Sequence, residues 1–319
     1  MSDTGRLTSF ARKELGASNI GTIIMGEGFV TPNDILKSAV TEYSGIGDTN
    51  FINNPKVAAG KMLEDPIAQL FKAVIEEQIG KKIVLIQPRK AYTYDLPNGK
   101  LGSSIDRMLV LDKPYDLTDT SDTNWNLGQD QIVVEIKNYA GSAKDPIRPS
   151  YLYQLQQQML CCKAEKGILV RLVNGWMLQW FVFDRDEAMV EDIKSAGTDF
   201  WNRFDGVVQN KDFWYEPYDT KEASQMYKGN QSKDVVDMGS NENLKPLIQK
   251  FVKARDDEKL AKIRKDEASL QIKMHMKDVE LAAYHGYLLR HTTSKRQKTK
   301  VIKIPDQFTE TRVFTIKEN

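Results

Sequence analysis

The chain has 319 residues, of which 40% are hydrophobic and 28% charged, and its formal net charge at pH 7 is +1. This composition fits a globular protein with one large domain or a core and a smaller attachment, and it argues against a uniformly basic surface. Cys161 and Cys162 are the only cysteines and are neighbours, so we expect a reducing compartment and no structural disulfide or four-thiolate metal site. No secretory leader pattern and no apolar run of membrane-spanning length is seen, so we expect neither secretion nor insertion into a membrane.

The first part of the chain predicts two helices. Residues 1–30 change from polar to apolar, and we expect either a surface lead-in to the first helix or a phosphate contact. Residues 31–43 begin with a threonine that can cap a helix, a proline suited to its first turn and an early acid, so they predict a helix. Residues 57–79 are also helical in pattern, and Pro66 predicts either a start near Asp65 or a longer helix that bends.

Short strands are expected next. Residues 82–87 and 91–94 have strand patterns and precede an Asn-Gly turn signal. Residues 104–111 predict a further strand, whose alternation puts Asp106 on one of its two faces. Residues 112–130 are polar and contain five aspartates, so we expect a long solvated loop there.

The segment after this loop predicts a sheet with helices on both faces. The expected elements are a strand, a helix, a β-hairpin with an Asn-Gly turn and a last helix, at residues 132–137, 150–166, 168–183 and 187–204. Gln154 and Gln158 are four residues apart in the first of these helices, so they should lie together beside its apolar stripe.

The C-terminal third has a different composition. Residues 216–245 are polar and predict a linker or a loosely packed excursion, after a core of residues 1–215. Residues 246–319 predict a long charged helix and short strands, a wing for DNA binding or oligomerisation. This wing contains a basic run without an acid, formed by Arg290, Lys295, Arg296, Lys298, Lys300 and Lys303. The run could bind phosphates or be an exposed tail without a fixed partner.

Two acids and a lysine suggest chemistry. Asp106 and Glu135 lie on separate predicted strands, and carboxylates are the ligands that Mg²⁺ and Mn²⁺ prefer. The peptide carbonyl of Ile136 could add a third oxygen, and Lys137 shares the face of Glu135. A cation and a lysine placed this way are the parts that phosphodiester hydrolysis needs. The triplet alone favours a salt-bridged surface strand, but Asp106, the acid at Glu64 and the glutamine-rich helix that follows together favour the cation site.

Four short segments, taken in order, carry a family resemblance. They read GKMLE at 60–64, GSSID at 102–106, VEIK at 134–137 and YQLQQQM at 153–159. In this order and spacing they resemble the YqaJ-like viral recombinases, lambda-exonuclease-like phage nucleases of the PD-(D/E)XK superfamily. The resemblance covers roughly residues 10–205. It implies an α/β fold with a restriction-endonuclease-like core, in which helices flank a central mixed β-sheet, and a C-terminal helix-and-strand extension.

The resemblance also implies an activity. It is that of a Mg²⁺-dependent 5′–3′ exonuclease, with Mn²⁺ as a substitute, that digests linear double-stranded DNA and leaves single strand for phage-type recombination. The implied partners are DNA with a free end, a single-strand annealing protein and further copies of the chain, a trimer by family. The implied location is the cytoplasm of a bacterial host, as a phage or prophage protein. Two alternatives are an endonuclease of the same fold, restriction-like or junction-cutting, and an inactive DNA-binding recombination protein.

Catalytic roles follow from the same resemblance, residue by residue. Asp106 and Glu135 match the metal ligands, and Lys137 matches the lysine that positions and activates the attacking water. Glu64 matches an upstream acid near the metal. Gln154 matches a glutamine that orients the nucleophile or the scissile phosphate.

DNA-binding roles are implied for other positions. Arg12 and Ser18 fall where relatives bind a terminal 5′-phosphate, and the basic run would contact DNA. The family usually has proline before and glycine after the aspartate, where this chain has Ile105 and Arg107. This difference concerns the geometry of the segment around the acid.

Overall fold

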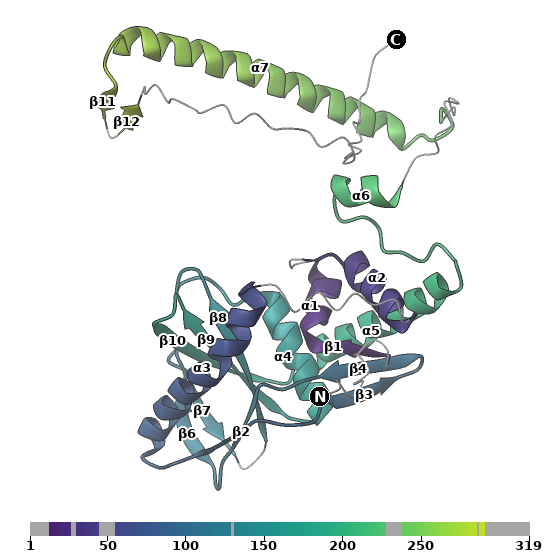
Figure 1. Cartoon of the computed structure of the whole chain (residues 1–319), viewed down its shortest axis with the longest axis vertical. Helices are drawn as coiled ribbons and strands as arrows, with labels where there is room; N and C mark the ends of the chain where they lie inside the picture. The colour runs from purple at the N-terminus through teal and green to yellow at the C-terminus, as the bar shows by residue number, and fades with distance from the viewer. Residues whose placement is uncertain are drawn as a thin grey trace, which may run out of the picture. The chain divides into compact units, whose positions relative to one another are not determined.

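The structure is a computed structural model that describes residues 13–26, 30–44, 55–128, 131–227, 238–285 and 287–290. The chain divides into two compact units, Met1–Ala223 and Ser224–Asn319, each of which is described by itself (Figure 1). Among the described residues no helix has both the length and the apolar character needed to cross a membrane.

A mixed five-stranded sheet forms the centre of the first unit, in the order β10-β9-β8-β5-β2. Its strands are β2 (Val84–Ile86), β5 (Arg107–Val110), β8 (Ile132–Tyr139), β9 (Lys166–Val173) and β10 (Met177–Asp184). The pair β8–β9 is parallel and the other pairs are antiparallel. The expected central mixed sheet is confirmed, and so is the hairpin of β9 and β10.

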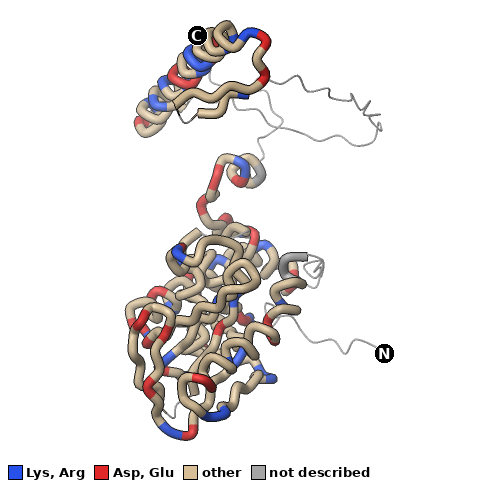
Figure 2. Tube along the Cα trace, turned by 90° about the vertical axis from the view of Figure 1, so that its left-hand side faces the viewer, with Lys and Arg blue, Asp and Glu red and all other residues tan. Residues whose placement is uncertain are grey.

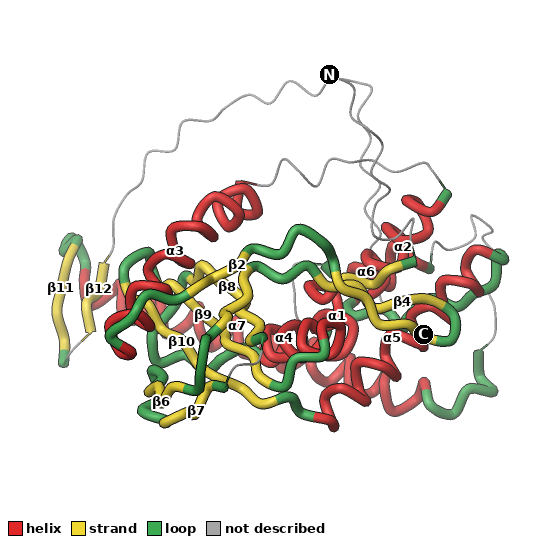
Figure 3. The backbone as a smooth tube through the Cα atoms, turned by 90° about the horizontal axis from the view of Figure 1, so that it is seen from below, coloured by secondary structure: helices red, strands yellow, loops and turns green. Residues whose placement is uncertain are grey.

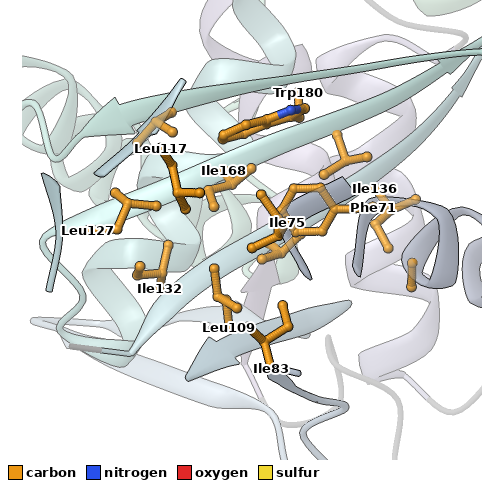
Figure 4. Packing of buried hydrophobic residues seen from close by; sticks show 14 of the residues in the cluster. Phe71, Ile75, Ile83, Leu109, Leu117, Leu127, Ile132, Ile136, Ile168 and Trp180 are labelled. Carbon is orange, nitrogen blue, oxygen red and sulfur yellow. The ribbon is translucent and has the colours of Figure 1, made fainter. Parts of the chain in front are cut away.

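Helices cover both faces of this sheet, as expected (Figure 3). Helix α3 (Pro55–Ile79) packs on one face, where Phe71 and Ile75 meet alternate residues of the strands and the Trp180 ring (Figure 4). Helix α4 (Pro149–Cys162) packs on the other face through Leu155 and Met159. Because strand side chains alternate between faces, the position of Glu135 in β8 decides which helix its side chain faces.

A second, smaller sheet has the order β1-β4-β3, and helices pack beside it. Its elements are β1 (Glu14–Gly16), β3 (Tyr92–Leu96), β4 (Gly99–Ser103), α1 (Ala17–Met25), α2 (Pro32–Tyr43) and α5 (Glu187–Val208). Leu15 and Ile20 are fully buried there against Trp201 and Phe204. For residues 13–26 the expectation of a surface lead-in was therefore wrong, because the apolar side chains of β1 and α1 belong to this core, while residues 1–12 and 27–29 lie outside the described residues.

Three further expectations need correction or completion. Helix α3 is continuous from Pro55 to Ile79 with Pro66 inside it, so of the two alternatives the longer helix is right. The predicted strand 104–111 is shorter, because β5 begins only at Arg107 and Asp106 lies in the bend before it. The expected loop 112–130 contains a two-stranded hairpin, β6 (Tyr115–Thr118) and β7 (Asn124–Leu127), whose Leu117 and Leu127 are buried.

A buried aspartate holds this hairpin in place. One carboxylate oxygen of Asp119 accepts hydrogen bonds from the Ser121 amide and hydroxyl (2.8 and 2.6 Å) and the Thr123 amide (3.3 Å). The other accepts from Trp125 Nε1 at 3.0 Å and from the amide of Val182 in β10 at 3.2 Å. Burial would raise the pKa of Asp119, but these donors outweigh it and hold that pKa below its ordinary value.

The second unit contains a long helix and a small hairpin. These are α7 (Leu244–Met276), β11 (Leu281–Tyr284) and β12 (Tyr287–Arg290), while α6 (Thr220–Met226) lies at the boundary of the units. Residues 216–245 thus include a short helix that was not expected. Charges of both signs follow α7 along its length (Figure 2), and Met276 is its only buried residue.

We expect Asp119→Ala to lower the free energy of unfolding by about 3 kcal/mol, because it leaves buried N–H and O–H donors without an acceptor. Asp116→Ala is the matched control, since Asp116 is exposed in the same hairpin and should cost about 0.5 kcal/mol or less. Chemical denaturation measures both.

The low pKa of Asp119 gives this difference a pH dependence. The stability that the carboxylate contributes is present above its unfolded pKa of about 4 and is lost as the pH falls through the lower folded value. An Asp119→Ala protein as stable as the Asp116→Ala protein at pH 7 would contradict the anchoring role.

Candidate active site

The site forms where β5 and β8 separate. Arg107 pairs with Val134 in the antiparallel ladder, and before Arg107 the chain leaves the strand. The carboxylate of Asp106 then takes the place of the next backbone acceptor, since its Oδ2 accepts the amide of Ile136 at 2.9 Å. The amide and carbonyl of one strand residue point to the same neighbouring strand. The Ile136 carbonyl therefore also faces the side of Asp106.

Glu135 lies at the centre of the site and is only 2% exposed. Its Oε1 accepts Gln154 Nε2 at 2.6 Å and lies 2.6 Å from Lys137 Nζ. Its Oε2 accepts Gln158 Nε2 at 2.5 Å. A carboxylate can be buried as an ion only when donors of this kind replace water, and charged hydrogen bonds are the strong ones.

Helix α4 supplies both glutamines from one face. Gln154 and Gln158 are one turn apart, so their amides reach the same carboxylate from consecutive turns. The prediction that these two residues lie together is confirmed. Glu135 and Lys137 alternate with Ile136, whose side chain packs on the α3 side, so both point to the α4 side.

Lys137 is held as an ammonium. Its Nζ donates to Gln154 Oε1 at 2.8 Å and lies 5.0 Å from the centre of the Tyr151 ring. Burial would lower the pKa of Lys137, but the charge of Glu135 and the hydrogen bond to it outweigh burial and raise that pKa above its ordinary value. At neutral pH the lysine is thus a cation and a proton donor.

Asp106 is in the opposite situation. Burial, and next the charge of Glu135, raise the pKa of Asp106 to about 8. A divalent cation between the two carboxylates would remove this penalty, so the arrangement fits one. Within the described ranges, no three His, Cys, Asp or Glu side chains gather as a metal site. A cation here would therefore use two carboxylates, the Ile136 carbonyl and water, which is a set of hard oxygens that suits Mg²⁺.

Glu64 approaches the site from the other face of the sheet, and its carboxylate pairs with Arg107. Glu64 Oε1 accepts Arg107 Nη1 at 2.8 Å. The same guanidinium pairs with Asp65 and donates to the backbone carbonyl of Asp106. The side chain of Arg107 is 5% exposed, so a buried cation balances the acids of α3 beside Asp106.

Sequence reasoning missed two contributors to this site. Arg107 was noted only as a departure from the family motif, although its place beside Asp106 was a signal. Gln158 was grouped with Gln154 but given no role, although the spacing of four residues was visible. Both residues act on neighbouring acids through hydrogen bonds, and a pattern of single residues does not show such contacts.

The structure brings together five of the residues predicted for the site: Glu64, Asp106, Glu135, Lys137 and Gln154. Ser18 is exposed in the first turn of α1, and Arg290 is exposed at the end of β12 in the second unit. Five further predicted contacts lie outside the described residues: Arg12, Lys295, Arg296, Lys298 and Lys300.

We expect Asp106→Asn to stabilise the cation-free protein, because it removes a carboxylate whose ionisation is opposed by burial and by Glu135. Near pH 8 the free energy of unfolding should rise by about 1 kcal/mol or more, which is roughly 2–4 °C in Tm. The folded-state pKa is raised, so this advantage should grow as the pH rises from about 4 to about 8. Thermal unfolding in a chelator measures it.

Asp112→Asn is the control, because Asp112 is exposed and pairs with Lys81 and Tyr115 outside the site. It should bring no stabilisation. A Tm for cation-free Asp106→Asn protein below that of the wild type would contradict the raised pKa of Asp106.

Comparison with known proteins gives one relative in sequence. No model of a known protein family matches the chain. YqaJ of Bacillus subtilis (strain 168), an uncharacterised protein, is 24% identical over 305 residues, which is 93% of this chain and 86% of YqaJ.

Solved structures share a weaker likeness. The alkaline exonuclease LHK-Exo from Laribacter hongkongensis aligns with a TM-score of 0.44 and 16% identity, over 63% of this chain and 92% of that one. A phage-related exonuclease from Haemophilus somnus 129PT aligns with a TM-score of 0.39 and 11% identity, over 61% and 96% of the two chains. The similarity in sequence to YqaJ runs along nearly the whole chain.

Proposed function

We propose that this protein is a divalent-cation-dependent nuclease that hydrolyses phosphodiester bonds of double-stranded DNA. The observation that carries the proposal is the arrangement around Glu135. Burial and, next, the charge of Glu135 raise the pKa of Asp106, and an ammonium and two amides hold the Glu135 carboxylate in place. Two buried acids of this kind are suited to bind a cation.

The cation would be held by Asp106, Glu135 and the carbonyl of Ile136. When bound, Mg²⁺ supplies Lewis acidity that lowers the pKa of a water ligand and neutralises charge on the phosphate. The same oxygen donors would accept Mn²⁺.

Lys137 and Gln154 would prepare the substrate side of the site. The Gln154 amide accepts from Lys137 and donates to Glu135, so its orientation is fixed at both ends. Lys137 keeps its proton, so it would hold the attacking water by a hydrogen bond or stabilise the negative charge that develops on the phosphate. It would act as a fixed positive charge and not as a general base.

The finer proposal is a 5′–3′ exonuclease that prepares single strand for recombination. It is supported by the order of the four motifs, which resemble those of lambda-exonuclease-like phage nucleases. Its substrate would be linear duplex DNA, with a single-strand annealing protein and further copies of the chain as partners. Ser18 and the basic run that begins at Arg290 would contact phosphates.

Lys137→Ala should reduce Mg²⁺-dependent degradation of linear duplex DNA by about 100-fold or more, because the site loses its fixed positive charge. Binding to duplex DNA should be nearly unchanged, since one contact among many phosphate contacts is lost. Gel assays of degradation and of binding measure the two effects separately.

Lys82→Ala is the matched control, since the Lys82 side chain is 90% exposed and pairs with Glu76 away from the site. It should keep wild-type activity. A wild-type protein that binds DNA but never cuts it at any Mg²⁺ or Mn²⁺ concentration would rule out the enzyme.

Covalently closed circular duplex should resist degradation, because an exonuclease requires an end. The same plasmid, linearised, should be digested, and a 5′ label should be released early as mononucleotide. Digestion with 5′-phosphate and 5′-hydroxyl ends tests whether a terminal phosphate is recognised. Nicking of the circle as fast as digestion of the linear form would indicate an endonuclease of the same fold.

A further inference from the structure

We propose that Gln158 is a positioning residue that turns the Glu135 carboxylate so that its Oε2 oxygen is the one that binds the cation. The inference rests on the proposed function, because it assumes that a cation binds between Asp106 and Glu135. It assigns a role to a residue of this chain that the motifs leave without one.

The hydrogen bonds to Glu135 are unequally divided. Oε1 accepts Gln154 Nε2 and also meets Lys137 Nζ, each at 2.6 Å. Oε2 accepts only Gln158 Nε2, at 2.5 Å, among the residues that the structure describes. An ionised carboxylate offers about four lone-pair directions on its two oxygens. Oε1 is saturated, so the direction left for a cation is on Oε2.

Gln158 also ties Glu135 to the segment that carries the other acid. The same Nε2 donates to the carbonyl of Ser104 at 3.2 Å, two residues before Asp106. One buried amide thus contacts the carboxylate on β8 and the link between β4 and β5. It therefore fixes the position of one acid relative to the other.

Burying Gln158 costs free energy. Its side chain is 0% exposed, and within the described part of the chain its Oε1 has no hydrogen-bond partner. A buried carbonyl without a donor costs about 1–3 kcal/mol, which an apolar residue of similar size would avoid. An apolar residue could replace the packing of Gln158 but not its N–H donors.

The neighbouring residue Gln157 provides a control that differs from Gln158 only in the groups to which its amide donates. Gln157 is also 0% exposed, and its Oε1 also lacks a partner in the described residues. Its Nε2 donates to the carbonyls of Leu15 at 2.9 Å and Gly102 at 3.0 Å, so it contacts backbone only. Replacing Gln157 removes the same chemistry from the same helix without touching a carboxylate.

The experiment measures Mn²⁺ binding to the cation-free full-length protein by isothermal titration calorimetry. Gln158→Met, which keeps the volume and removes the donors, should weaken Mn²⁺ affinity by roughly 10- to 100-fold, the usual effect of losing a partner of a metal ligand. Gln157→Met should keep the affinity within about twofold of wild type. The Tm of each variant in chelator reports its folding separately.

A second measurement uses the wild-type protein and does not depend on a variant that folds. Mn²⁺ broadens NMR signals steeply with proximity, so the side-chain amide of Gln158 should broaden at lower Mn²⁺ than that of Gln157. Equal affinity of Gln158→Met and wild type, or no preferential broadening of Gln158, would overturn the inference. A wild type that binds no Mn²⁺ at all would instead overturn the proposed function.

Discussion

A carboxylate buried in the middle of a sheet is the constraint on which this site depends. Glu135 is 2% exposed, and an ion in such a place is tolerated only when protein donors replace its water. Those donors come from one face of α4 and from the next residue but one on β8. The packing of α4 against the sheet therefore has two effects. It buries Leu155 and Met159, and it brings the side-chain amides of Gln154 and Gln158 to the Glu135 carboxylate.

The second requirement is a strand that stops early. Backbone pairing between β5 and β8 ends at Arg107 and Val134, and the Asp106 side chain takes over the next hydrogen bond. Had the ladder continued, the Ile136 amide and carbonyl would have been used by backbone. The end of the ladder is thus what lets the Asp106 carboxylate lie beside Ile136 and Glu135.

Sequence patterns predicted much of this arrangement and failed for physical reasons elsewhere. Alternation placed Glu135 and Lys137 on one face, and the spacing of four placed Gln154 with Gln158. The predicted strand around Asp106 was longer than the observed strand β5, because the alternating pattern does not show where backbone pairing stops. Ile105 and Met108 both pack on the α4 side although they differ in parity, so alternation does not continue before Arg107.

The failures share a cause, which is contact between distant segments. Residues 13–25 were misjudged because their apolar side chains are buried by α5, which comes much later in the chain. Polar residues between Asp106 and Glu135 suggested a loop, yet Asp119 gathers them into a hairpin through its own hydrogen bonds. Arg107 could be understood only once α3 had placed Glu64 beside it.

That hairpin also bears on how such a site can change in evolution. It is fastened to the edge strand β10 at Trp180 and Val182 and to α3 at Gln78, so the forces that fix it act away from the two acids. The segment between Asp106 and Glu135 can therefore change in length without changing how the two acids lie relative to each other. Its turn at Asp122 is then a natural point for lengthening the chain, where a lineage could acquire a new surface feature without rebuilding the contacts around Glu135.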